Sequence, residues 1–302
     1  MISSGATVGH NKQRGLTAPE SVLVHQTGFT HDIADKSKYN YQRRRGRLRE
    51  TWFPENQAAL DRLQQKENIV LRFVIGKHDN PEMEQQIGDE SNECGGCFLR
   101  IDFEERYLNL AHKTLAFISM VVSLYDADYI VKIDDDVYLR LDRLPSVVRQ
   151  WSSMKKDYVG CMKNGQIFTD RHYRWYEPQH RLLGSKTYFT HAWGCVYALS
   201  GRAAALLSSI DPNMLRFFNN EDVTLGSWLL AFNISHYDDR RLCEASCSQT
   251  SLVVYDFPDC AGLCDPYARL PEVHADPQCK LPTFPEGSQE VPKVAEIIKC
   301  DE

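Results

Sequence analysis

Short apolar runs recur along the first half of the chain and end at glycine or at polar residues. Runs of this length and composition are typical of buried strands. Four strands are expected, at residues 21–25 with Thr27-Gly28 closing the run, at 69–76, at 98–101 and at 129–131.

Helical patterns separate these runs. Residues 43–65 have helical spacing, which Pro54 interrupts, and residues 108–125 are apolar nearly all round, as in a core helix. A second organised unit follows at 189–209, with a further apolar helix running through Phe232. Strands that alternate with helices predict an α/β fold with a mostly parallel central sheet flanked by helices, whose ligands lie beyond the carboxyl ends of the strands.

One large domain is expected from 302 residues, of which 42% are hydrophobic. Residues 1–20 are polar and predict a disordered lead-in, and the Pro- and charge-rich residues 281–302 predict a tail. The ordered domain is therefore expected to cover 21–280.

The net charge of −6, from 35 basic and 41 acidic residues, argues against nucleic acid as a partner. Basic residues do concentrate at 43–49, where one anionic ligand finds a local match. No stretch is long and apolar enough to span a bilayer, and the first twenty residues lack the centre of a signal peptide.

Ten cysteines, five of them within residues 243–279, favour disulfides in an oxidising compartment. Zinc is the alternative, since Cys94 and Cys97 have metal-compatible spacing. Asn233 begins a possible N-glycosylation motif. Disulfides are expected, but the first twenty residues do not look like a signal peptide. Either the chain is therefore a truncated form of a secretory protein, or its cysteines are reduced.

Three adjacent carboxylates, Asp134, Asp135 and Asp136, directly follow the apolar run at 129–131. Consecutive side chains of an extended segment point to opposite faces, so Asp134 and Asp136 share one side and suit a hard divalent cation. The alternative is an acidic surface turn. The flanking apolar residues favour a cation, because buried carboxylates are costly without one.

A second acidic pair, Glu221-Asp222, precedes the helix that runs through Phe232. One of these carboxylates is a candidate general base, and the alternative is that the pair only caps the helix. Aromatic residues at Tyr173, Trp175 and Tyr176 either stack on a sugar or belong to the core.

Several segments in the same order resemble glycosyltransferase family 31, the inverting β-1,3-galactosyltransferase-type enzymes, and particularly the plant-type branch. The resemblance covers roughly residues 20 to 280. The blocks that carry it are Arg45 to Trp52, Phe73 to Gly76, Phe98 to Asp102, Lys113-Thr114, Lys132 to Val137, Tyr158 to Lys163, Tyr176 to Pro178, Tyr188-Phe189, His191-Ala192, Gly194 to Ser200, Glu221 to Gly226 and Asp238 to Cys243.

This resemblance implies a GT-A-type fold, with a nucleotide-sugar-binding half at 21–150 and an acceptor half with a Cys-rich end at 151–280. It implies transfer of galactose from UDP-galactose to the 3-hydroxyl of a glycan on a glycoprotein acceptor, with Mn²⁺ or another divalent cation. It also implies a location in the Golgi lumen, with membrane association only through a segment that this sequence does not contain.

The resemblance assigns roles to particular residues. Asp222 is the expected base, with Glu221 orienting a sugar. Asp136 is the expected direct metal ligand, with Asp134 beside it and His236 completing the shell. The expected cofactor-binding residues are Arg45, Arg49, Thr27, Asp134 and Asp135.

Two departures from the family pattern stand out: Cys97 replaces the usual aspartate, and no membrane anchor is present in the sequence. Alternatives stay open for the function. The donor is UDP-GlcNAc or UDP-GalNAc in one alternative, and the chain is a non-catalytic sugar-binding or chaperone-like relative in the other.

Overall fold

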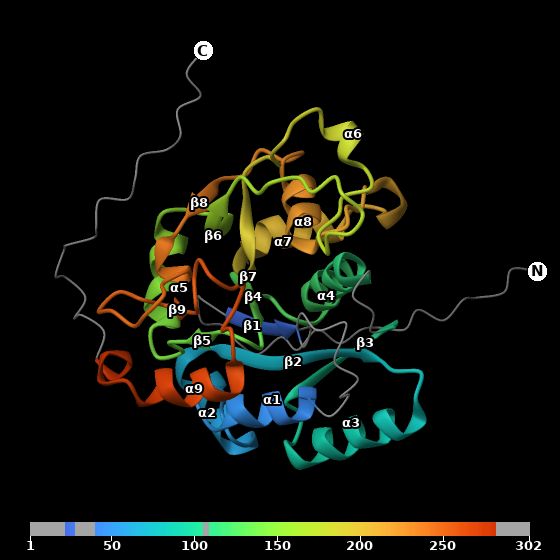
Figure 1. Ribbon diagram of the computed structural model, residues 1–302. Coiled ribbons are helices and arrows are strands. Elements are labelled where there is room, and N and C mark those ends of the chain that lie inside the picture. The colour runs from blue at the N-terminus through green and yellow to red at the C-terminus, as the bar shows by residue number, and fades with distance from the viewer. Residues whose placement is uncertain (1–21, 28–39, 105–108, 282–302) are drawn as a thin grey trace, which may run out of the picture.

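Strands from both halves of the chain form one seven-stranded sheet in the computed structural model, which describes residues 22–27, 40–104 and 109–281 (Figure 1). The expected lead-in, Gly28 and all of the tail except Leu281 lie outside the described residues. The strands run in the order β3-β2-β1-β4-β7-β6-β8, and β7 alone is antiparallel to its neighbours. The expected mostly parallel α/β sheet is confirmed.

The four strands expected in the first half are all present, and further strands follow in the second half. Their bounds are β1 Val22–Thr27, β2 Ile69–Lys77, β3 Phe98–Glu104, β4 Tyr129–Asp134, β6 Tyr158–Lys163, β7 His191–Ser200 and β8 His236–Asp238. A separate two-stranded ladder pairs β5 Tyr138–Leu139 with β9 Val253–Val254.

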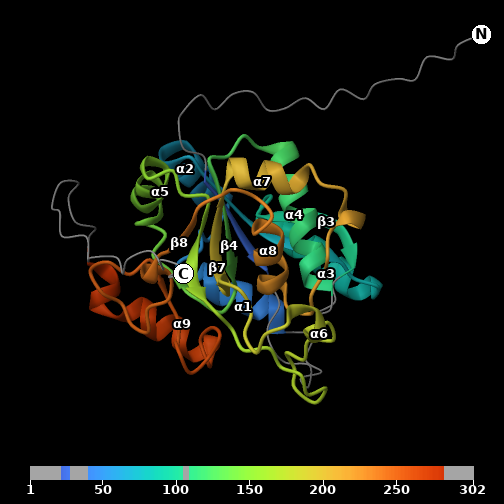
Figure 2. The same ribbon diagram turned by 90° about the horizontal axis from the view of Figure 1, so that it is seen from above.

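Helices cover both faces of the sheet, with α4, α7 and α8 on one face and α1, α2 and α9 on the other (Figures 1 and 2). The α-helices are α1 Asn40–Arg49, α2 Gln57–Glu67, α3 Pro81–Glu93, α4 Leu110–Leu124, α5 Leu144–Ser153, α6 His180–Leu183, α7 Gly201–Ser208, α8 Glu221–Leu229 and α9 Pro266–Ala275. Short 3-10 turns are η2 Pro212–Met214, η3 Arg240–Leu242 and η4 Pro277–Lys280. None of the helices within the described ranges is long and apolar enough to cross a membrane.

Alternation along β4 decides which layer each side chain enters. Tyr129, Val131 and Ile133 pack into the core beneath α1, α2 and α9, whereas Ile130 packs beneath α4, α7 and α8. The same alternation sends Lys132 and Asp134 toward the α4 and α8 layer, so the sheet directs Asp134 to the layer that also contains Glu221 and Asp222.

Eight cysteines form disulfides, which confirms the expectation of oxidised cysteines. The pairs are Cys94–Cys97, Cys161–Cys243, Cys247–Cys279 and Cys260–Cys264. The alternative of zinc at Cys94 and Cys97 is therefore wrong. Cys195 is buried as a free thiol, and Cys300 lies outside the described residues.

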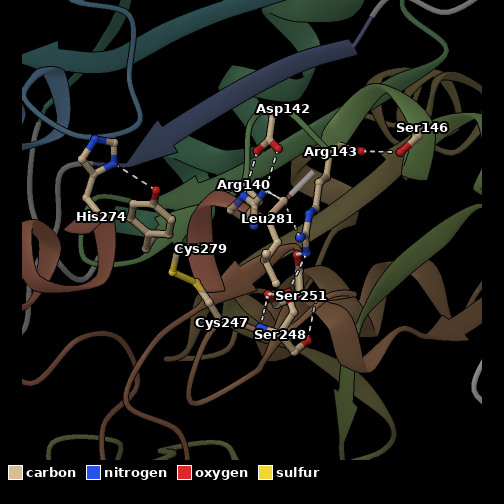
Figure 3. A network of polar contacts seen from close by, with 11 residues as sticks. Arg140, Asp142, Arg143, Ser146, Cys247, Ser248, Ser251, His274, Cys279 and Leu281 are labelled. Carbon is tan, nitrogen blue, oxygen red and sulfur yellow. Dashed lines mark hydrogen bonds and ion pairs between the residues drawn. A yellow bond between two sulfur atoms is a disulfide. The ribbon is translucent and has the colours of Figure 1, made fainter. Parts of the chain in front are cut away.

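Two arginines after β5 fix the end of the described chain (Figure 3). Arg140 and Arg143 both donate to the backbone carbonyl of Leu281, at 2.7 and 3.1 Å. Arg143 also donates to the carbonyls of Ser248 and Ser251. These bonds, with the Cys247–Cys279 disulfide, hold the Cys-rich end against the rest of the domain.

Candidate functional site

Three strand ends meet at one edge of the sheet. β4 ends at Asp134 and β6 ends at Lys163, while the antiparallel β7 begins there with His191. The start of α8 lies over this edge. Its Asp222 is close to Gly194 of β7, since a Cβ built on Gly194 would be 3.5 Å from the Cβ of Asp222. Residues up to 90 positions apart in the sequence are thus brought to one place.

A cavity of about 440 Å³ opens at this edge. Its charged lining residues are four carboxylates (Asp134, Glu221, Asp222 and Asp259), two lysines (Lys132 and Lys163) and His191. Its aromatic lining residues are Phe168, Trp175, Tyr188 and Trp193. We call the four carboxylates the acidic floor of the cavity and the four aromatic residues its aromatic wall.

Asp222 is ion-paired at this floor. The Lys163 Nζ is 3.0 Å from its Oδ2, and the His191 Nε2 is 3.8 Å from the same oxygen. Burial by itself raises the pKa of Asp222, but Lys163 and His191 outweigh burial and lower the pKa to about 2. The side chain is therefore a carboxylate at neutral pH.

Glu221 is held by two hydroxyl groups. Thr114 and Tyr197 donate to the same oxygen, Oε1, at 2.9 and 2.5 Å. Burial, with a smaller contribution from Asp222, raises the pKa of Glu221 despite the opposing effect of Lys132. The two neighbouring acids thus have pKa values displaced in opposite directions, a pattern typical of sites where two carboxylates have different roles.

Lys132 lies between these acids and the end of β4. Its Nζ is 2.6 Å from Asp134 Oδ1, and it also donates to the carbonyl of Gly194. Burial by itself lowers the pKa of Lys132, but Asp134 and Glu221 raise it above the usual value. Lys132 therefore stays charged and ties the first acidic motif to the second.

Asp135 and Asp136 lie in the turn that follows β4, and neither is a lining residue of the cavity. Asp135 accepts from Arg44 Nη1 at 3.0 Å, on the α1 side, as the alternation of side chains requires. Asp136 is covered by Gly262, where an added Cβ would lie 2.5 Å from the carboxyl carbon of Asp136. Asp136 is thus beneath the wall of the cavity, next to Ala261, which lines it.

The acidic turn meets one test for a cation site. Asp136 Oδ1 and Asp135 Oδ2 are buried and have no hydrogen-bond partner. Burial and then the charges of Asp134 and Asp135 raise the pKa of Asp136 well above its usual value. Within the described ranges, no three His, Cys, Asp or Glu side chains converge as a ready-made cage. Two carboxylates with incomplete partners fit a cation that takes its other ligands from phosphate and water.

Arg45 and Arg49, which were expected to bind the cofactor, do not line the cavity. Arg45 forms a two-pronged ion pair with the buried Glu90, at 2.9 and 2.5 Å, and Arg49 Nη2 is 2.8 Å from the same carboxylate. These contacts join α1 to α3. Thr27, by contrast, ends β1 as the backbone neighbour of Asp134.

His236 is not brought to the aspartates. It pairs with Tyr158, whose register through β7 places it level with Ile130, four residues before Asp134. That separation is roughly 13 Å along the strands and about 14 Å across them. We do not propose His236 as a ligand of a metal held by Asp134 and Asp136.

Four residues of the site were not singled out as functional from the sequence alone: Arg44, Lys132, Lys163 and His191. Lys132 and Lys163 each belong to a motif that resembles the family, and the signal that could have found them is their position at the end of a buried strand. Arg44 could not be singled out within the basic run at 43–49, because it differs from Arg45 only in the side of the helix on which it lies.

A family comparison covers most of this domain. Residues 43–240 match the model of the family described as galactosyltransferase, which is more than half of the chain. The chain belongs to the galactosyltransferase family. The matched region contains the aspartates at 134–136 and the Glu221-Asp222 pair, whereas Asp259 lies beyond it.

Curated relatives agree with this assignment. The chain is 45% identical over 261 residues to the "Probable beta-1,3-galactosyltransferase 12" of Arabidopsis thaliana, covering 86% of this chain and 67% of that protein. It is 42% identical to the "Probable beta-1,3-galactosyltransferase 13" of the same plant, covering 82% and 71%. The expected resemblance to the plant-type branch of this family, with its α/β GT-A-type single-domain fold, is confirmed.

Among solved structures, the chain is similar to a putative glucose-1-phosphate thymidylyltransferase from Bacillus anthracis. The two are 12% identical with a TM-score of 0.36, over 72% of this chain and 85% of that one. This likeness is too remote to support a functional conclusion.

Proposed function

We propose that this chain is an inverting hexosyltransferase that moves galactose from UDP-galactose to the 3-hydroxyl of a glycan acceptor on a glycoprotein, forming a β-1,3 linkage. Family membership and the names of the relatives support galactosyl transfer. The observation that carries the mechanism is that Asp134 and the Glu221-Asp222 pair line a single cavity.

The donor diphosphate belongs at the acidic floor only together with a cation. The cavity lining has four carboxylates and two lysines, and both lysines are already paired, Lys132 with Asp134 and Lys163 with Asp222. A diphosphate would therefore meet net negative charge. We propose that Asp136 and Asp134 hold Mn²⁺ or another divalent ion. Such an ion would supply positive charge to the diphosphate leaving group.

Asp222 is the proposed base. Inversion needs one displacement, in which the acceptor oxygen attacks the anomeric carbon as its proton passes to a carboxylate on the acceptor side. The low pKa keeps Asp222 ionised at neutral pH, which is the protonation state that a base needs. Contact with Lys163 holds the carboxylate in position, and Lys163 remains to stabilise the negative charge when no acceptor is bound.

Glu221 is proposed to orient a sugar rather than to take a proton. One of its oxygens is occupied by the hydroxyl groups of Thr114 and Tyr197, which fix the carboxyl group in a single orientation. The second oxygen is left to accept from a sugar hydroxyl. Asp135 is proposed to contribute through Arg44, which secures the acidic turn to α1.

The proposed location is the Golgi lumen. Four disulfides support an oxidising compartment. The two cysteines of Cys161–Cys243 are 82 residues apart, so this bond joins distant parts of the acceptor half.

UDP release with a panel of nucleotide sugars tests the proposal. With Mn²⁺ and a glycan acceptor, UDP-galactose is expected to give the fastest release, and chelation by EDTA is expected to stop it. Faster turnover of UDP-GlcNAc or UDP-GalNAc would contradict the donor assignment. Absence of release from every donor would contradict catalysis itself.

A further inference from the structure

The aromatic wall of the cavity is not used by the donor or by the base. Phe168 and Trp175 line the cavity together with Gln166, on the segment between β6 and β7. Trp175 is 37% exposed, which is unusual for so large an apolar side chain. An indole that faces a cavity with catalytic acids on its floor is placed to meet a ligand.

The wall is built before any ligand arrives. The Phe168 ring lies between Tyr173, with centroids 5.1 Å apart, and Trp175, with centroids 5.8 Å apart. The Arg174 guanidinium lies 5.9 Å from the Trp175 ring centroid. These contacts restrict the indole, so little side-chain entropy remains to be lost on binding.

A buried glutamate fixes the wall relative to the base. Glu177 is fully buried, and its carboxylate accepts from the backbone N–H groups of Asn219, at 3.1 Å, and Gln179, at 2.9 Å. Its own N–H donates to the carbonyl of Phe168 at 2.8 Å. Asn219 is three residues before Asp222, so one side chain couples the aromatic segment to the start of α8.

We infer that Phe168 and Trp175 form the acceptor subsite, and that it takes a neutral hexopyranoside ring rather than a bare peptide side chain. This assignment rests on the proposed function and names its acceptor class. One face of a pyranose ring is formed mainly by C–H groups, which stack on an aromatic surface while the hydroxyl groups at the ring edge stay available. A serine or threonine side chain offers no such face.

The charges of the lining select against an acidic sugar. Among the described residues, no arginine lines the cavity, and both of its lysines are engaged by carboxylates. The Arg174 guanidinium, which lies 5.9 Å from the Trp175 ring centroid, is not part of the lining. A uronic acid or a sialic acid would bring a further negative charge next to Asp222 and Asp259. A neutral ring stacked on Trp175 meets no such repulsion, and Asp222 lines the same cavity.

Saturation-transfer NMR with methyl β-galactopyranoside tests the subsite without any need for turnover. In the wild-type protein, the ring C–H protons are expected to receive the strongest saturation. Trp175→Ala is expected to abolish that pattern, and Trp175→Phe to retain part of it. Leu182→Ala is the matched control, because Leu182 is 64% exposed on the same segment and is not a lining residue. An unchanged pattern in Trp175→Ala, or an equal loss in Leu182→Ala, would overturn the assignment.

Kinetics separate this inference from the proposed function. Trp175→Ala is expected to raise the KM for a galactoside acceptor roughly three- to tenfold, with kcat within about twofold. Leu182→Ala, which changes no lining residue, is expected to leave the KM for the acceptor and the hydrolysis of UDP-galactose unchanged. Preference for a sugar-free Ser/Thr peptide over the galactoside would overturn the acceptor class alone. Loss of all UDP release in the wild type, with intact galactoside binding by NMR, would instead remove the proposed reaction and leave the subsite.

Discussion

Lys163 contributes most to the ionisation of Asp222, and His191 adds to its effect. Lys163 is 3.0 Å from the Asp222 carboxylate and also lies 3.9 Å from the centroid of the Trp193 ring, which limits its movement. Without that ammonium group, burial would raise the pKa of the carboxyl. Lys163 therefore sets the pH range over which a base at this position works.

Lys163→Met is expected to move the acidic limb of the pH–rate profile upward. In the wild type the pKa of Asp222 is about 2, so the ionised base persists until the pH falls far below the physiological range. In the variant the pKa rises and activity is lost at higher pH. The profile of kcat/KM against pH measures this shift, and Lys163→Arg, which keeps the charge, is the control. An unmoved limb in Lys163→Met would remove Lys163 from this role.

Gly262 lies so close to the Asp136 carboxylate that a side chain at this position has no room. An added Cβ would lie 2.5 to 2.6 Å from the carboxyl atoms of Asp136, closer than such contacts occur. Gly262→Ala is expected to displace that carboxylate and to weaken activation by Mn²⁺ by about 10- to 100-fold. The Mn²⁺ dependence of UDP release measures this effect. Gly88→Ala, where nothing lies within 4 Å of the added Cβ, serves as the control, and equal behaviour of the two variants would refute the prediction.

At the residue scale the sequence predicts the acids better than their partners. Asp134, Glu221 and Asp222 stand out because they belong to clusters of adjacent carboxylates beside apolar runs, and all three line the cavity. The lysines that pair with them, Lys132 and Lys163, were not predicted, because a single lysine in a strand has no distinctive spacing. The separation of His236 from Asp134 follows from the pairing of β8 with β6, which no local pattern reveals.

At the scale of elements, one carboxylate joins two helices. Glu90 of α3 is 3% exposed and pairs with both Arg45 and Arg49 of α1. Glu90→Ala is expected to lower the free energy of unfolding by about 3 to 5 kcal/mol, because it leaves buried guanidinium groups without a partner. Urea denaturation measures the change.

Glu93→Ala provides the matched control on the same helix, because Glu93 is exposed. Its effect on the free energy of unfolding is expected to stay within about 0.5 kcal/mol. If Glu90→Ala were as mild as Glu93→Ala, the clamp between α1 and α3 would contribute nothing to stability.

Strands and core helices could be predicted, whereas polar or short elements could not. β2, β4 and α4 follow directly from apolar runs, since each is buried on both sides or nearly all round. α3 was not predicted, because Pro81–Glu93 is mostly polar and buries only Ile87 and Glu90. The segment between β6 and β7 was expected only as an aromatic-rich region, because Glu177 organises it through contacts to residues 40 positions away.

At the scale of the whole molecule, three disulfides join parts of the second half of the chain. Cys161–Cys243 links β6 to the end of η3 across 82 residues. Replacing both cysteines with serine is expected to cost about 4 kcal/mol of stability, because a loop of this length gains much entropy in the unfolded chain. Thermal unfolding measures the loss, and the short loop of Cys260–Cys264 provides a comparison for which a smaller loss is expected. Equal losses would contradict the loop-entropy explanation.

Asp222, from the second half of the chain, is proposed to act on a sugar that the first half holds. Asp222→Asn tests this proposal most directly, with UDP binding measured by calorimetry and galactosyl transfer measured on the same preparation. UDP affinity is expected to stay within about twofold while transfer falls by about 10²- to 10⁴-fold. Transfer at a near wild-type rate would contradict the account.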